Sequence, residues 1–232
     1  MRTALVLAAF AGVLAIPLNA QSFIVSGGTT SVGPFTKGPA GFQSFGQSFT
    51  APSGSPTMQS FGIAFSNFFN GGALRFNAYV YAFDVPSRQL TGNALWSFLG
   101  SAGSSNYFGF DTQRFNTLDI PLTGGSTYLF LVTASNSGAG VPDDASNLVL
   151  ANDRDEYDAG AFWAASNGSD FNALFAAGAF GTVDGISDLN FKAVFGSRAE
   201  IVPEPSTSVL SAFGMLVLLA VVRRKVSQTR HP

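Results

Sequence analysis

Alternation of apolar and polar positions predicts that this chain is built from short β-strands. The clearest segment covers residues 74 to 83, where every second residue is apolar and the intervening positions carry a row of aromatic residues. The first face holds Leu74, Phe76, Ala78, Val80 and Ala82, and the second holds Arg75, Asn77, Tyr79, Tyr81 and Phe83. A period of two is typical of a strand whose two faces meet different surroundings.

Shorter apolar or alternating runs are spread along the chain between clusters of Gly, Pro, Ser and Asn. We predict strands at Phe45–Thr50, Met58–Phe69, Ala94–Leu99, Phe115–Ile120, Thr127–Ala134, Leu148–Ala151, Gly160–Ala164 and Leu189–Phe195. Only Ser169–Gly178 is predicted as a helix, and a short one, because Gly and Phe occur within it. Many short strands with such turns favour an all-β fold, an antiparallel sandwich or a barrel.

Composition agrees with a folded core and excludes several chemistries. Of the 232 residues, 46% are hydrophobic and only 11% are charged, and 24 are Phe. The chain has no Cys, which rules out disulfides, thiolate metal sites and cysteine nucleophiles. A formal net charge of -2 argues against nucleic acid as a partner, because such partners require clustered Lys and Arg.

Residues 1–20 have the pattern of a secretory signal peptide. Met1-Arg2 supplies a positive charge, and an apolar stretch runs from Ala4 to Ile16. Leu18-Asn19-Ala20 ends the segment before Gln21, with the polar Asn19 next to the small Ala20. A buried N-terminal helix is the alternative, but the stretch shows no amphipathic period. We therefore expect signal peptidase to cut after Ala20 and the protein to be exported.

A second apolar run, Val209–Val222, lies near the other end and contains no charge. With Ser206 to Ser208 it extends over residues 206–222, which is the short end of what spans a bilayer. The basic residues that follow at once, Arg223, Arg224 and Lys225, should stop transfer and stay cytoplasmic, placing the upstream chain outside the inner membrane. A core helix would need a polar face, which this run lacks.

Before the apolar run stand Val202, Pro203, Glu204 and Pro205, which exclude helix and central strand and leave an extended, accessible segment. Together with the apolar run and the basic residues, this box resembles the PEP-CTERM sorting signal of Gram-negative bacteria. The resemblance implies processing by an exosortase, an anchored precursor in the inner membrane, and a final location at the cell surface or in an exopolysaccharide-rich biofilm matrix. It divides the chain into residues 1–20, an exported domain 21–201, and a sorting signal 202–232.

Phrases within the exported domain also resemble ectodomains that are common in PEP-CTERM proteins. They are Gly46 to Pro52, Phe76 to Ala82, Leu122 to Tyr128 and Asp188 to Ala193. The resemblance covers roughly residues 40 to 196 and implies a jelly-roll β-sandwich of the galactose-binding-like kind. The phrases consist of strand and turn residues, so they support a fold more than an activity.

The exported domain lacks the usual catalytic groups. Its chain contains neither Cys nor His, because the single His is His231. This excludes a serine triad with a histidine base, a cysteine protease and a His-ligated zinc site. Glu156 and Glu200 are its only glutamates, so a glycosidase would depend on Asp with at most Glu156 as the acid. We expect that the protein is not an enzyme.

Acidic residues cluster between positions 143 and 158, a region that includes Asp143 and Asp144. Closely spaced carboxylates in a loop suit calcium, and the candidate ligands are Asp153, Asp155, Glu156 and Asp158. The alternative is a solvated acidic loop, which the poor match to a calcium-loop motif favours.

Aromatic side chains on the surface would offer flat apolar faces to sugar rings. The candidates expected to be exposed are Tyr79, Tyr81, Tyr157 and Trp163. Two functions therefore stay open. The first is a non-catalytic surface or matrix protein, and the second is a carbohydrate-binding module with an aromatic or calcium-organised sugar site.

Overall fold

Two antiparallel sheets form the domain, as the computed structural model describes it for residues 21–28, 30–39, 41–54, 56–66, 74–102, 109–135 and 146–197. These residues all belong to one compact unit that ends at Arg198. The predicted signal peptide (1–20) and sorting signal (202–232) lie outside the described residues. The predicted all-β, antiparallel architecture is confirmed.

The first sheet is organised around β4 (Pro56–Ser66), which pairs with β12 (Phe191–Ser197) and with β7 (Phe110–Pro121). Next to β12 lies β1 (Gln21–Val25). At the end of β4 the sheet continues into β9 (Ser146–Asn152), which pairs with β2 (Thr30–Thr36) and with the two-residue β11 (Asp188–Leu189).

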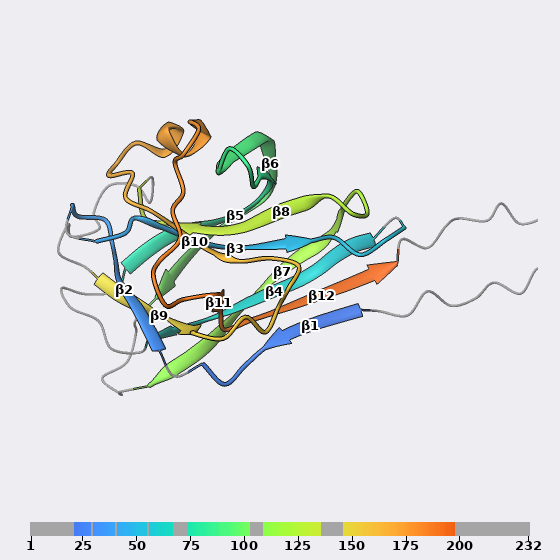
Figure 1. The fold of residues 1–232 in the computed structure, drawn as a ribbon, viewed down its shortest axis with the longest axis horizontal. Helices are drawn as coiled ribbons and strands as arrows, with labels where there is room; N and C mark the ends of the chain where they lie inside the picture. Colours follow the sequence, from blue (N-terminus) through green and yellow to red (C-terminus); the bar gives the residue numbers. More distant parts are fainter. Residues whose placement is uncertain are drawn as a thin grey trace, which may run out of the picture. The chain divides into compact units, whose positions relative to one another are not determined.

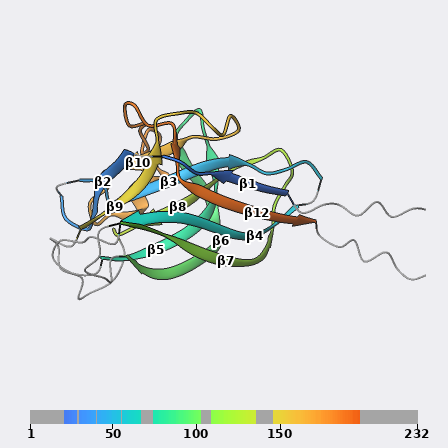
Figure 2. The ribbon, with the colours of Figure 1, turned by 90° about the horizontal axis from the view of Figure 1, so that it is seen from below.

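The second sheet has the order β10-β3-β8-β5-β6. Its strands are β10 (Phe162–Ala165), β3 (Ser44–Thr50), β8 (Thr127–Thr133), β5 (Leu74–Asp84) and β6 (Gln89–Ala102). Figures 1 and 2 show this sheet as a layer that lies over β4, β7 and β12.

The strand pairs are nested along the chain. The hairpin β5–β6 lies innermost, β4 pairs with β7 around it, β3 with β8 around those, and β1 with β12 outermost. Because Gln21 lies opposite Phe195, the start of β1 and the end of β12 are at the same end of the domain (Figure 1).

Phenylalanine rings fill the space between the sheets. Phe61 of β4 stacks on Phe130 of β8 with ring centroids 4.0 Å apart, and on Phe191 of β12 at 5.4 Å. These rings are at most 2% exposed. Such packing joins the two sheets through many van der Waals contacts and removes large apolar areas from water.

The alternation predicted for residues 74–83 holds only for its first part. Leu74, Phe76, Ala78 and Val80 are buried between the sheets as expected. Tyr81 and Phe83 are buried too, in a second apolar cluster on the outer face of the second sheet. The register with β6 shifts between Val80 and Ala82, and the chain around residues 171 to 180 covers this outer face.

Most of the predicted strands are confirmed, with longer bounds than expected for β6 and β7. The helix predicted for Ser169–Gly178 is a five-residue 3-10 helix, η1 (Phe171–Phe175), capped by the Asp170 side chain. Strands β1 and β2 were not predicted; β2 carries Gly33-Pro34 within it, which obscures the alternation. In the described part of the chain, no helix has the length and apolarity needed to cross a membrane.

We predict that residues 21–201 fold alone and that Val80→Asp unfolds them. Val80 is fully buried between Phe130 and Trp96 of the flanking strands. An unpaired carboxylate there costs several kcal/mol, a large share of a typical domain stability of about 5–15 kcal/mol. Circular dichroism and thermal melts should show loss of the β signal and of the transition. Ser22→Asp, at an exposed position on β1, is the control; a helix-dominated spectrum or an unchanged melt for Val80→Asp would contradict the fold.

Candidate functional site

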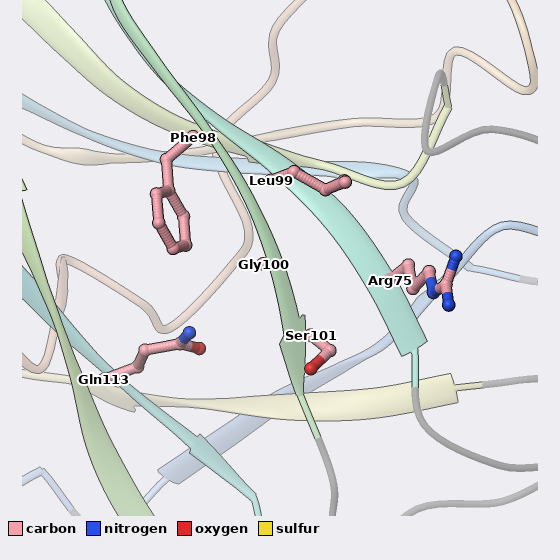
Figure 3. A pocket seen from close by; sticks show the side chains of 6 residues that line it. All are labelled: Arg75, Phe98, Leu99, Gly100, Ser101 and Gln113. Atoms are coloured by element: carbon pink, nitrogen blue, oxygen red, sulfur yellow. The ribbon is translucent and has the colours of Figure 1, made fainter.

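A shallow open groove of about 310 Å³ lies where β6, at the end of the second sheet, passes β7 of the first. Figure 3 shows the residues that line it, which come from three strands. They are Arg75 from β5, Phe98, Leu99, Gly100 and Ser101 from β6, and Gln113 from β7.

The apolar part of the groove belongs to a row of aromatic side chains that extends from the core to the surface. The Phe98 ring is 46% exposed and stacks parallel to Trp96, with centroids 6.1 Å apart. Behind it, Phe98 meets the edge of the buried Phe115 ring at 5.7 Å. Gly100 lies against Phe76, where an added Cβ would be 2.6 Å from the ring, so only glycine leaves this ring in place.

The polar residues of the groove are divided between the two faces of β6, with Gln113 on the side of Phe98 and Arg75 and Ser101 on the other. Arg75 and Ser101 lie opposite each other in the β5–β6 register, and both are exposed. In Figure 3 the Gln113 amide extends from β7 toward Phe98. The exposed Phe98 ring and the Gln113 amide beside it can hold a small polar ligand with one apolar face, because the ring stacks while the amide donates and accepts hydrogen bonds.

The groove lies at the end of the domain opposite the start of β1. Gln113 lies opposite Ile63, Ile63 opposite Phe191, and Phe191 opposite Val25, the last residue of β1. Gln21, where β1 begins, is at the other end. A ligand in the groove would therefore be held at the far end from the point where the chain enters and leaves the sandwich.

The expected exposure of the candidate aromatic residues is wrong for three of them. Tyr81, Tyr157 and Trp163 are only 6%, 7% and 6% exposed. Trp163 donates its indole N–H to Ser48 Oγ at 3.0 Å, and Tyr157 packs against Phe23 and Phe191. Tyr79 is half-buried, with its ring 5.1 Å from that of Phe171. The sequence did not place Phe98, the aromatic residue that lines the groove, among the exposed candidates.

The candidate calcium ligands Asp153, Asp155, Glu156 and Asp158 are exposed. Among the residues that the structure describes, no three acidic, His or Cys side chains are grouped so that they could hold a metal ion. Asp143 and Asp144 lie outside the described residues. Calcium binding stays a prediction without a formed site in the described part of the chain.

The loop between β9 and β10 is held by hydrogen bonds to a buried carboxylate, which the sequence analysis did not single out. Asp188 of β11 is fully buried, and its Oδ2 accepts hydrogen bonds from the backbone N–H groups of Glu156 (3.0 Å) and Tyr157 (3.1 Å). Its Oδ1 accepts from Gln47 Nε2 at 2.8 Å. Gln47 belongs to β3, so this carboxylate ties the loop and both sheets together.

Gln47 is itself held in one orientation. Its Oε1 accepts a hydrogen bond from the Leu189 N–H at 2.8 Å, so its amide nitrogen faces Asp188. Gly160 completes the close approach of the loop, because a Cβ at this position would collide with the carbonyl oxygen of Ser48. The only sequence signal for this network is an Asp placed at the start of an apolar strand.

Burial is the largest influence on the pKa values of Asp188 and Tyr157. It raises the pKa of Asp188, against the lowering effect of the hydrogen bonds from Gln47, Tyr157 and Glu156. Burial also raises the pKa of Tyr157 to about 12; the Thr50 backbone opposes this rise and the Asp188 carboxylate adds to it. The Tyr157 hydroxyl and the Asn152 amide nitrogen are buried without a hydrogen bond of normal geometry. These groups contribute to the core and are inaccessible to a ligand.

Comparisons with known proteins place the chain in no family. No family model matches it, and no curated protein matches it. One similar solved structure is a variant of the clostridial cysteine protease Cwp84 after propeptide cleavage, with 14% identity and a TM-score of 0.45 over 77% of this chain and 40% of that chain. Another contains the cysteine protease and lectin-like domains of Cwp84, a surface layer associated protein of Clostridium difficile, with 13% identity and a TM-score of 0.43 over 77% of this chain and 36% of that one. This chain spans less than half of either protein, and likenesses this weak assign no activity.

We predict that Asp188 makes stability depend on pH. Because its pKa in the folded chain is above the ordinary 3.8, the folded chain keeps this proton where the unfolded chain has lost it. Its contribution to stability is therefore complete below pH 3.8 and is lost as the pH rises through the folded pKa. Relative to Asp188→Asn, which does not titrate, the free energy of unfolding of the wild type should fall over this interval in urea titrations.

Asp158→Asn is the control for this experiment, because Asp158 is exposed and in the same loop. If Asp188→Asn does not fold, an NMR titration of the Asp188 carboxyl carbon reports the same pKa in the wild type. A difference between wild type and Asp188→Asn that does not vary with pH, or a pKa below 3.8, would show that burial does not dominate the titration of this carboxyl.

Proposed function

We propose that the chain is a non-catalytic, exported surface or extracellular-matrix protein that an exosortase sorts, in association with exopolysaccharide or biofilm. The observation that carries this proposal is the order of elements at the C-terminus: Pro203-Glu204-Pro205, the apolar run 209–222, and Arg223 to Lys225. Three ordered elements behind a signal-peptide pattern at residues 1–20 are more specific than any one of them alone. Signal peptidase and exosortase are the processing partners, and the inner membrane holds the precursor.

Two observations support a role without catalysis: the structural use of a buried carboxylate and the residue types that the chain contains. Asp188, the most deeply buried carboxylate among the described residues, accepts three hydrogen bonds from its own chain and holds two sheets and a loop. The chain contains no Cys, and its single His is His231. The chemistry of the common hydrolase nucleophiles and bases is therefore not available from these residue types.

We infer that the sandwich has jelly-roll topology of the galactose-binding-like kind. The nested strand pairs support this inference, because a jelly roll is a long hairpin wrapped round so that first and last, second and second-last strands pair. The same nesting brings the start of β1 and the end of β12 together at one end.

The sorting proposal predicts that both ends of the chain are removed in the native host. Cell fractionation followed by mass spectrometry of the mature protein should give an N-terminus at Gln21 and a C-terminus upstream of Val209. Glu204→Ala should make the membrane-anchored precursor accumulate. Glu200→Ala, four residues upstream, is the matched control and should be processed normally. A mature protein that keeps Met1, or that keeps residues 209–222 in cells containing the exosortase, would refute the proposal.

The second candidate function is carbohydrate binding, and the groove beside β6 favours it. Phe98 offers an exposed ring, Gln113 offers a hydrogen-bonding amide beside it, and Arg75 and Ser101 line the groove on the other face of β6. This combination is the usual one for sugars, whose ring carbons stack on an aromatic face while their hydroxyls bond to polar side chains. The groove replaces Tyr81, Tyr157 and Trp163 as the place where such a ligand would bind.

A glycan array with the wild-type protein should identify at least one sugar with a dissociation constant below about 1 mM. Phe98→Ala should weaken this binding by about tenfold, equivalent to ~1.4 kcal/mol, since it removes the stacking surface. Ile24→Ala is the control, because Ile24 is a comparably exposed apolar residue on β1. If no glycan binds, or if Phe98→Ala binds as well as the wild type, the groove is not a sugar site.

A further inference from the structure

Strand β6 ends the second sheet and lacks the usual protection of an edge strand. Its 14 residues, Gln89–Ala102, include no charged residue and no proline. Natural proteins block exposed edges with Lys, Pro, bulges or very short strands, because an open edge presents unpaired backbone N–H and C=O groups to other chains. β6 does have an irregular stretch opposite Tyr81, but the seven residues Trp96 to Ala102 pair regularly with β5.

Apolar side chains are concentrated on this same strand. Leu95, Phe98 and Leu99 are 43%, 46% and 60% exposed and lie within five positions. Leu99 and Phe98 belong to opposite faces of the strand, so apolar surface is present on both sides of the edge. A partner strand laid along β6 would cover these side chains and complete the ladder of backbone hydrogen bonds.

The other edges that the structure describes are protected. β7, at the edge of the first sheet, carries Asp111, Arg114 and Asp119, and its backbone has positive φ at Leu118 (55°) and Asp119 (58°). β1, β10 and β11 are short, with five, four and two residues, and β2 contains Pro34. Among these edge strands, β6 alone combines a length of 14 residues with the absence of charge and proline.

We propose that β6 pairs antiparallel with β6 of a second copy of this chain, so that the second sheet continues through a twofold axis. A second copy fits because β6 carries no charge, so whichever of its residues meet across a twofold axis do so without charge repulsion. Two β7 strands paired in this way would bring Arg114 and the acidic residues of both copies close together. Strand addition of this kind gains affinity from the backbone and specificity from the apolar side chains.

The inference concerns the domain itself and does not depend on export or sorting. Self-pairing at β6 would give a surface or matrix protein a means of associating with its own copies. Because Phe98 and Ser101 also line the groove, the pairing and the sugar hypothesis make different demands on the same strand.

The chain has no cysteine, so a single introduced cysteine reports only contacts between two copies. Ser97→Cys, Leu99→Cys and Ser101→Cys place a thiol at alternate exposed positions of β6, and Thr112→Cys places one at an exposed position of β7 as the matched control. The full-length variants are expressed in cells and treated with a short, membrane-permeant bis-maleimide. This reagent reaches the chain on either side of the membrane, so failed export and failed pairing give different results.

We expect a cross-linked dimer from the β6 cysteines, strongest at the one position nearest the twofold axis, and little or none from Thr112→Cys. Adding Ser97→Lys to Leu99→Cys should reduce the dimer at least about tenfold, because each copy then carries a lysine within the paired edge. Thr112→Lys added to Leu99→Cys should leave it unchanged. Equal cross-linking at β6 and β7, or a dimer that survives Ser97→Lys, would overturn the proposal.

Discussion

The buried carboxylate of Asp188 is the constraint on which the arrangement of sheets and loop depends. It lies in β11 of the first sheet, accepts a hydrogen bond from Gln47 of the second, and accepts two from the loop that carries Glu156 and Tyr157. A carboxylate that is fully buried is costly unless its oxygens have donors, and here each oxygen has at least one. The Phe rings supply most of the apolar contact between the sheets, but they have no directional preference strong enough to fix one loop against both layers. The hydrogen bonds of Asp188 are directional and fix the loop against both sheets.

The alternation of residues along the sequence was enough to predict an all-β chain and most of its strands. It was not enough to predict which face of each strand is covered. Tyr81 and Phe83 fall on the face opposite Val80, yet both are buried because the distant segment around Leu174 and Phe180 packs over them. Tyr157 and Trp163 are buried for a similar reason, since each packs against strands far away in the sequence. When a distant segment covers a strand face, the local sequence of that strand shows no periodic pattern that would reveal it.

The acidic loop and the groove show that functional sites were equally hard to predict from the sequence. Closely spaced carboxylates suggested calcium, but the role of the described loop depends on its backbone N–H groups and on Asp188, which is 32 positions beyond Glu156. The groove depends on which strand ends a sheet, and only the pairing of β6 with β5 defines that. Once the pairing is known, the exposed Phe98, the polar residues beside it and the uncharged edge follow from residues that look ordinary in the sequence. The proposed sorting signal is the opposite case, because its three elements are contiguous in the sequence and need no knowledge of the fold.

Amide hydrogen exchange tests the central claim, that Asp188 holds the loop and both sheets as one unit, most directly. The amides of Glu156, Tyr157 and Leu189 all donate to the Asp188–Gln47 pair, so they should exchange as slowly as the amides of the central strands and open only with the whole domain. The Asp158 amide, in the same exposed loop, should exchange faster. Fast exchange at Glu156 and Tyr157, at the rate of Asp158, would contradict the account.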